Sequence, residues 1–310
     1  MLKYITQRLL IAIPIALGVC VIVFSLMYFS PYDPAEAMAN EYHLDAEQIA
    51  MLRQEMKLDE PYFVQLGNWF LNLTRGNLGT SLIQRRPILE MIIGRFWTTF
   101  ELALAGMALA AFIGIILGVL AALKENSIWD NLSMTIALLG SAMPDFWLAL
   151  MFIFLFSLTL GWLPTLGQGS PKHLIMPAVV VGLAEAGVVA RTVRSSLIET
   201  LNEDYIRTAR SKGLKEQIIV IRHGLRNALI PTVTIIGINL GAVLGGVVVV
   251  ETVFAREGIG RLLVDSVLAT DIPVVQGVVL FSALVFLLVN LIVDVSYAFL
   301  DPRIRYETNR

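Results

Sequence analysis

Long apolar runs alternate with polar stretches along this chain. The first run, 9–29, has 21 uncharged residues, and at about 1.5 Å per helical residue it would cover roughly 30 Å, the thickness of a bilayer core. We expect each run to be helical, because a sheet with open edges would leave backbone groups unpaired in lipid. The six predicted spans are 9–29, 102–123, 132–163, 174–190, 228–250 and 272–293.

Composition places the chain among integral membrane proteins. Of its 310 residues, 56% are hydrophobic and 15% are charged, whereas a soluble domain has about 25% charged residues. Lys3 and Arg8 precede the first run as they would in a signal peptide, but a signal core has only about 7–15 apolar residues. We therefore expect a retained span. The one cysteine, Cys20, allows no disulfide within the chain.

The placement of lysine and arginine predicts that both ends of the chain face the cytoplasm. Eight of these 23 residues lie between the fourth and fifth predicted spans, at Arg191, Arg194, Arg207, Arg210, Lys212, Lys215, Arg222 and Arg226. The short loops on the other side hold Lys172, Arg256 and Arg261. The expected order is a first span at 1–29, an extracytoplasmic segment at 30–95, a five-span core at 96–300 with a cytoplasmic loop at 191–227, and a cytoplasmic tail at 301–310.

The extracytoplasmic segment is predicted to contain a helix at 45–58. Asp45 is suited to cap it, since Gln48 follows three residues later in the pattern of a capping box. Aromatic residues and leucines between 62 and 73 predict a second piece at the membrane interface. We expect a small packed cap, and a docking surface for a soluble, substrate-delivering protein is the alternative.

The cytoplasmic loop has a helical pattern of its own. Apolar residues or tyrosine recur at 197, 201, 205 and 209, which predicts an amphipathic helix over 195–212. Gly213 then supplies a helix stop or sharp turn, and Pro231 loosens the first turn of the fifth span. A basic loop could simply touch anionic lipid. A helix with one apolar face instead favours a groove on a partner protein.

Two sequences in this loop carry a family resemblance: DYIRTARSKGL at 204–214 and RHGLRNALIP at 222–231. They resemble the cytoplasmic loop of ATP-binding-cassette importer permeases, in the branch that moves dipeptides, oligopeptides, glutathione and nickel. The similarity covers nearly the whole chain. It includes LGTSL at 78–82, SAMPDFWLAL at 141–150, GWLPTLG at 161–167, GRLLVDSV at 260–267 and DPRIRY at 301–306.

Some positions depart from the patterns of these permeases. The general importer motif is E-A-A followed after three residues by glycine, whereas here the sequence RTA at 207–209 precedes Gly213. This difference argues against sugar and amino-acid importers. Glu257 stands where the branch usually has proline, so the resemblance does not define the exact turn in that outer loop. Glu185 stands where a small or uncharged residue is expected.

The resemblance implies a non-catalytic subunit of a transport complex in the bacterial inner membrane. Its partners would be a second, homologous permease, two cytoplasmic ATPases that use ATP and magnesium, and an extracytoplasmic substrate-binding protein. The chain lacks the phosphate-loop pattern G-x-x-x-x-G-K-[ST], so we expect it to bind no cofactor itself. The residues expected to couple it to the ATPases are Tyr205, Arg207, Ala209, Arg210, Gly213, Leu214, Arg222 and Arg226.

Polar residues inside the spans are candidates for the transport pathway, because charge in a membrane is costly. Glu185 would meet a cationic group of the substrate, or it would bond Arg191 or a neighbouring helix. Asn239 lies between two glycines, and Asp145 follows a proline and could cap a helix fragment. Glycines spaced by four predict close helix contacts, either within this subunit or against the partner permease. They are Gly114, Gly118, Gly237, Gly241 and Gly245.

Other functional classes fit the sequence less well. The histidines are far apart and form no H-E-x-x-H pattern, and no G-x-S-x-G sequence is present, so neither a metal site nor a membrane-embedded enzyme is predicted. A secondary transporter should show inverted repeats, and it would leave the cytoplasmic loop unexplained. The basic residues lie where topology predicts them, which gives no support to nucleic-acid binding. We expect dipeptides or short peptides as substrates, with nickel, a nickel chelate or glutathione as alternatives.

Overall fold

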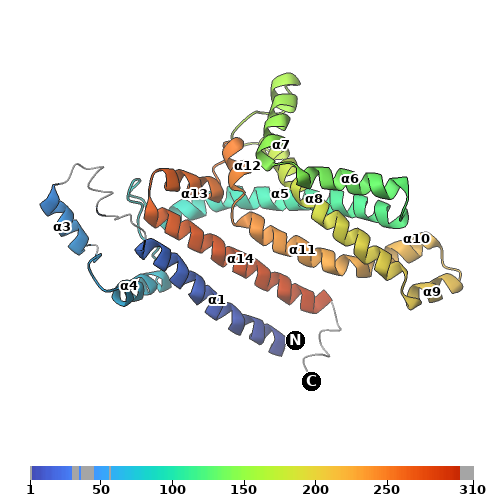
Figure 1. Ribbon diagram of the computed structural model, residues 1–310, viewed down its shortest axis with the longest axis horizontal. Helices are drawn as coiled ribbons and strands as arrows, with labels where there is room; N and C mark the ends of the chain where they lie inside the picture. Colours follow the sequence, from blue (N-terminus) through green and yellow to red (C-terminus); the bar gives the residue numbers. More distant parts are fainter. Residues whose placement is uncertain (1, 30–34, 36–44, 56, 301–310) are drawn as a thin grey trace.

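The computed structural model describes residues 2–29, 35, 45–55 and 57–300, which fold into helices (Figure 1). The predicted tail at 301–310, with its DPRIRY sequence, lies outside the described residues. The elements in chain order are α1 (Leu2–Tyr28), α3 (Ala46–Glu55), α4 (Tyr62–Thr74), α5 (Ile88–Leu123), α6 (Ile128–Ala142), α7 (Asp145–Phe152), the π-helical η1 (Ile153–Thr159), α8 (Lys172–Leu201), α9 (Asp204–Ser211), α10 (Glu216–Ile218), the π-helical η2 (Ile219–Leu225), α11 (Arg226–Leu244), α12 (Val248–Val253), α13 (Ile259–Leu268) and α14 (Ile272–Leu300).

Within the described ranges, five helices are long and apolar enough to cross a membrane, or six if one bent pair counts as a single span. The prediction of an all-helical membrane protein is therefore confirmed. The bent pair is α6 followed by α7 and η1, and its two parts meet at 98°. Pro144 lies at the break and has no N–H with which to continue α6. The predicted third span, 132–163, is thus broken rather than continuous.

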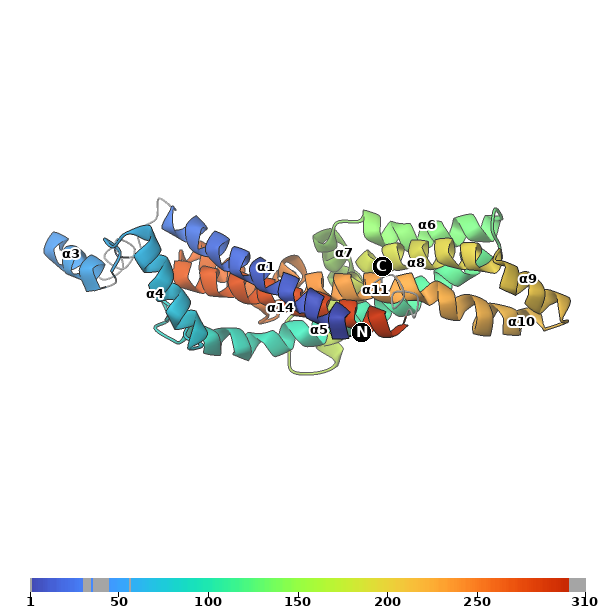
Figure 2. The ribbon, with the colours of Figure 1, turned by 90° about the horizontal axis from the view of Figure 1, so that it is seen from below.

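Helices α5 and α8 lie side by side at the centre of the structure, with α6 against α8 (Figure 1). Helix α11 contacts both α8 and α14, and α1 lies along α14 (Figure 2). Arg8 pairs with Asp294 at 3.1 Å, so the start of α1 and the end of α14 lie together. Apolar side chains of α1 point outward, with Leu10 62% and Leu26 69% exposed, as expected for a helix that faces lipid.

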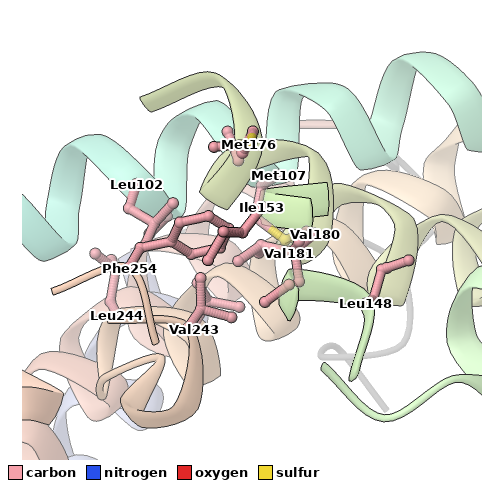
Figure 3. Close-up of a cluster of buried hydrophobic side chains, with 14 residues drawn as sticks. Leu102, Met107, Leu148, Ile153, Met176, Val180, Val181, Val243, Leu244 and Phe254 are labelled. Atoms are coloured by element: carbon pink, nitrogen blue, oxygen red, sulfur yellow. The ribbon is translucent and has the colours of Figure 1, made fainter. Parts of the chain in front are cut away.

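The largest apolar core lies where α5, α7, α8, α11 and α12 meet (Figure 3). Leu102 of α5 and Val180 of α8 are fully buried there, and Phe254, which follows α12, is 2% exposed. This core joins the broken span to the central helix pair. It therefore fixes the position of the break relative to α8.

Several helix boundaries differ from the predicted spans, and three of the differences are large. Helix α5 begins at Ile88 and α8 continues to Leu201, well beyond the uncharged runs 102–123 and 174–190. An uncharged run marks only the part of a helix that lipid surrounds. Helix α11 ends at Leu244 instead of 250, because Gly246 has a φ of +120° and the chain after it starts the separate helix α12.

The segment after α1 contains the predicted capping box. The backbone N–H of Gln48 donates to Asp45 Oδ1 at 2.9 Å, and the N–H of Asp45 donates to Gln48 Oε1 at 3.0 Å. The helix that follows is α3, which ends at Glu55. Helix α4 packs on α1 through aromatic rings, with the centroid of Phe24 5.6 Å from those of both Tyr62 and Trp69.

Candidate functional site

The helix predicted over 195–212 is two helices rather than one. Helix α8 continues through Leu201, and α9 begins at Asp204. The side-chain amide of Asn202 donates to the carbonyl of Ile198 at 3.0 Å, and such a local bond competes with continuation of the helix. Apolar residues keep a spacing of four on both sides of the turn. The periodicity therefore did not reveal it.

A Schellman motif ends α9 at the tip of the loop. Gly213 has a φ of +75°, and its N–H donates to the carbonyl of Arg210 at 2.9 Å. The N–H of Leu214 donates to the carbonyl of Ala209 at 3.4 Å. The backbone is left-handed at Gly213, where glycine is strongly favoured. The predicted sharp turn at this residue is confirmed.

Polar contacts join α9 to the segment that returns from the turn. Two nitrogens of Arg210 donate to the carboxylate of Glu216, at 2.7 and 3.3 Å. This hydrogen bonding raises the pKa of the Arg210 guanidinium. The hydroxyl of Tyr205 accepts a hydrogen bond from Asn227 Nδ2 of α11 at 2.8 Å. This bond links α9 to α11.

Helix α9 packs inward through its apolar face and presents a basic face outward. Ile206 is fully buried and Ala209 is 9% exposed, and both pack with the buried Ile219. Ala209 thus contacts its own subunit. The other side chains of the predicted coupling set are exposed: Tyr205, Arg207, Arg210, Leu214, Arg222 and Arg226.

The three polar pathway candidates come together beside the break in the bent span. Asn239 Nδ2 of α11 donates to Glu185 Oε2 of α8 at 2.6 Å. Asp145 starts α7 and lies within electrostatic range of Glu185. All three residues are half-buried. Glu185 bonds a neighbouring helix, as one alternative predicted, whereas Asp145 is not a cap, because Pro144 holds the N-cap position without a side-chain bond.

Gly114 and Gly118 of α5 allow close approach of α8. A Cβ on Gly114 would stand 2.6 Å from Val189 Cβ, and a Cβ on Gly118 would stand 2.6 Å from the carbonyl oxygen of Ala190. Both distances are far below ordinary contact. A Cβ on Gly114 would also stand 2.9 Å from the carbonyl oxygen of Ala186, so the backbone of α8 opposes a side chain at both positions.

The glycines of α11 have different surroundings. A Cβ on Gly237 would overlap the side chain of Val293, and one on Gly241 would stand 3.3 Å from Phe286 Cδ2. Both neighbours belong to α14. A Cβ on Gly245 would meet only carbonyls of its own helix, within the described residues. The first two glycines therefore serve packing inside this chain.

Replacing Gly118 with alanine is expected to destabilise the fold by about 1–3 kcal/mol, because the added methyl group forces α5 and α8 apart. The control is Gly67→Ala in α4. No atom of the described residues lies within 4 Å of a Cβ at Gly67, and alanine favours the helix. Thermal unfolding of the detergent-purified protein would measure both. Equal unfolding midpoints for the two variants would contradict the role assigned to Gly118.

An ion pair that the sequence did not reveal joins α6 to α8. Arg194 Nε and Nη2 donate to Asp130 Oδ1 and Oδ2, each at 2.7 Å, and the N–H of Asn126 donates to the same carboxylate at 2.9 Å. The Asp130 side chain is 5% exposed and that of Arg194 is 28% exposed. In the sequence, Arg194 served only as one of the cations that predict a cytoplasmic loop. No regular spacing connects it to Asp130, so the ion pair could not be predicted.

A second buried carboxylate, that of Glu251, lies in α12, which follows the C-terminal end of α11. Glu251 of α12 is fully buried and accepts hydrogen bonds from the Thr99 hydroxyl at 2.6 Å and the N–H of Arg261 at 3.1 Å. The Thr99 hydroxyl oxygen accepts from the N–H of Ile259 at 2.8 Å. Burial raises the pKa of Glu251, and these hydrogen bonds oppose that rise. Glu251 thus anchors the start of α13 to α5.

Known families cover both halves of the chain. Residues 1–103 match the family described as binding-protein-dependent transport system membrane component, N-terminal. Residues 114–306 match the family described as binding-protein-dependent transport system inner membrane component. Together these matches cover the described helices except for residues 104–113 of α5.

Individual relatives agree with this assignment. The chain is 46% identical over 307 residues to the glutathione transport system permease protein GsiC of Salmonella typhimurium, covering 99% of this chain and 100% of that protein. GsiC of Escherichia coli K12 is 45% identical over the same length. The inward-facing methionine transporter MetNI shares the fold, with a TM-score of 0.59 at 19% identity, over 68% of this chain and 96% of that one. The chain therefore belongs to the binding-protein-dependent transport system inner membrane components, and it is a multi-pass inner-membrane permease subunit of an ATP-binding-cassette importer of the peptide and glutathione branch.

Proposed function

We propose that this permease forms half of the translocation pathway for glutathione or other short peptides. The observation that carries the substrate class is the 46% identity to GsiC, which extends over the full length of that relative. Dipeptides were the first expectation from the sequence, and the relatives make glutathione the first candidate. Glutathione is itself a small peptide with a free amino group.

The exposed face of α9 is the proposed contact for a cytoplasmic ATPase. Arg207, which has 72% of its side chain exposed, would pair with acidic groups or helix ends of the ATPase. Closure of the ATPases would then move α9. The hydrogen bond from Asn227 to Tyr205 would pass the movement to α11, and α11 carries Asn239. The coupling site and the pathway candidates thus lie on one mechanical route.

The proposed complex contains a second, homologous permease, two ATPases and an extracytoplasmic binding protein. In this arrangement both ends of the chain and α9 face the cytoplasm. The pairing of Arg8 with Asp294 supports the placement of both ends on one side. The eight cationic residues between Arg191 and Arg226 support the placement of α9 on that side as well.

The complex itself supplies the test of this function. After purification in mild detergent, it would be reconstituted in liposomes with its binding protein, and uptake of labelled glutathione, a dipeptide and nickel would be compared. We expect glutathione to be taken up only with ATP and to stimulate ATP hydrolysis. Uptake by this chain alone, without ATPase subunits, would show a secondary transporter. ATP-driven uptake of nickel, without uptake of glutathione or the dipeptide, would contradict the proposed substrate but not the proposed importer.

Glu185 is proposed to meet the cationic amino group of the substrate. Glu185→Gln keeps an acceptor for Asn239 but removes the charge, so the specificity constant for glutathione is expected to fall about tenfold, equivalent to about 1.4 kcal/mol. Glu199→Gln is the control, because Glu199 is an exposed residue of the same helix. Initial rates of uptake would be measured in proteoliposomes. Unchanged kinetics for Glu185→Gln would assign Glu185 to packing alone.

A further inference from the structure

A pocket of about 420 Å³ is lined by residues of α1, of α4 and of the turns beside α4. Helix α4 lies against the end of α1 (Figure 2). The volume of the pocket is within the range of sites that hold small ligands, roughly 300–1,000 Å³. The rings of Phe24 from α1 and Trp69 from α4 line it. Polar side chains of α4, of the turn before α4 and of Arg75 after α4 line it as well. None of these polar residues belongs to the coupling site or to the pathway.

Two cationic side chains, Lys57 and Arg75, point to an anionic ligand. Lys57 lies in the turn before α4, Arg75 directly follows α4, and both line the pocket. Throughout the described part of the chain, neither side chain has an ion pair or a hydrogen bond. Asp59 and Glu60 follow Lys57 in the chain, but neither lines the pocket. Two cations that line one cavity, with no carboxylate among its described lining residues, favour a negative ligand there.

The backbone that carries Lys57 is held against α4. Gln65 Nε2 donates to the carbonyls of Leu58 and Glu60, both at 2.8 Å. Lys57 itself has a φ of +58°, a conformation that a residue other than glycine rarely adopts. Strained backbone of this kind persists only where surrounding contacts hold it. The position of the Lys57 cation is therefore built into the fold.

Amide donors extend the same polar surface. Asn68 and Asn72 are four residues apart on α4, so they share the face that leads to Arg75. In the described residues, neither side-chain amide has a hydrogen-bonding partner. Two amide N–H₂ groups and two cations thus border one pocket. Phosphate oxygens accept from donors of both kinds.

The pocket also lies at the boundary between membrane and water. The part of α1 that could cross the membrane is Thr6–Tyr28, and Phe24 is one turn from its end. Tyr62 and Trp69 contact Phe24, and such aromatic residues are typical of membrane interfaces. Leu71 lines the pocket and is 56% exposed, which leaves an apolar rim beside the polar surface.

We propose that this pocket binds the phosphate of an anionic phospholipid from the leaflet at the Tyr28 end of α1. The phosphate would contact Lys57 and Arg75, and an acyl chain would lie on the rim formed by Leu71. A protein carboxylate could also meet the cations. The interfacial rings favour lipid, because Phe24, Tyr62 and Trp69 cluster at the end of a membrane span, where lipid headgroups lie.

The proposed test measures phospholipid retained by the intact complex. Native mass spectrometry of the detergent-purified complex, with added phosphatidylglycerol or phosphatidylcholine, would compare Lys57→Gln/Arg75→Gln with Arg86→Gln/Lys172→Gln. The control pair removes two exposed cations that do not line the pocket. We expect the pocket variant to lose about tenfold in affinity for phosphatidylglycerol and the control to match the wild type.

Three results would overturn the proposal. An equal loss in both double variants would show a general charge effect on surrounding lipid. Phosphate-dependent binding that inorganic phosphate reproduces without lipid would show a free anion site. A lower affinity for the substrate-binding protein, with unchanged lipid retention, would assign the pocket to protein docking.

A second variant keeps the proposal testable if the double variant does not assemble. Asn72→Leu removes an exposed amide donor and retains both cations. We expect it to lower phosphatidylglycerol affinity about fivefold. Unchanged affinity would contradict the assigned site. None of these measurements requires transport, so their outcome is independent of the proposed substrate.

Discussion

Replacing Gly213 with proline is expected to abolish ATP-driven uptake while the complex still assembles in the membrane. Gly213 has a φ of +75°, whereas the proline ring fixes φ near −65°, and proline lacks the N–H that donates to Arg210. The turn that ends α9 would therefore open. The buried helices would be unaffected, because nothing lies within 4 Å of a Cβ at this position. Uptake and ATP hydrolysis by the reconstituted complex would measure the loss.

Two further substitutions at Gly213 separate backbone conformation from side-chain size. Asparagine tolerates the left-handed conformation, so Gly213→Asn should keep most uptake. Alanine there costs about 1–2 kcal/mol, so Gly213→Ala should lie between asparagine and proline. Normal uptake by the proline variant would contradict the coupling role of the turn. A proline variant that failed to assemble would show that the turn serves folding instead.

Features that depend on residues close in the chain could be predicted from the sequence. Uncharged runs located the membrane helices, since hydrophobic length is the main requirement for crossing a bilayer. The capping box at Asp45 and the turn at Gly213 were also predicted, because both motifs depend on residues three to five positions apart. The RHGLRNALIP and DYIRTARSKGL sequences indicated the family, and the relatives confirm it.

Features that depend on distant residues could not be predicted in this way. Thr99 and Glu251 belong to α5 and α12, and no periodicity connects them. The hydrogen bond between Asn239 and Glu185 also joins residues far apart in the chain. The sequence marked each as a candidate for the transport pathway but did not predict that they bond each other. Helix ends were also missed where the polar end of a helix extends beyond lipid, as at Leu201. Charge there carries little penalty, so the sequence shows no boundary.

The second large effect is expected at the ion pair between α6 and α8. Asp130→Ala should destabilise the protein by about 3 kcal/mol, because it leaves the Arg194 guanidinium without its two-point partner. This value is at the lower end of the range for buried pairs, since Arg194 is 28% exposed. Thermal and denaturant unfolding of the detergent-purified complex would measure it. Arg191→Leu is the control, because Arg191 is an exposed cation of the same helix.

A double-mutant cycle distinguishes the pair from its separate residues. Arg194→Leu alone leaves the carboxylate of Asp130 buried with a single N–H donor, from Asn126, so it should cost at least as much as Asp130→Ala. The double variant should be more stable than the sum of the single effects predicts. Additive effects would show that the two charges do not interact. Arg194 lies on α8 between Glu185 and α9. Loss of its ion pair with Asp130 should therefore also uncouple the complex, so that ATP is hydrolysed faster without uptake of substrate.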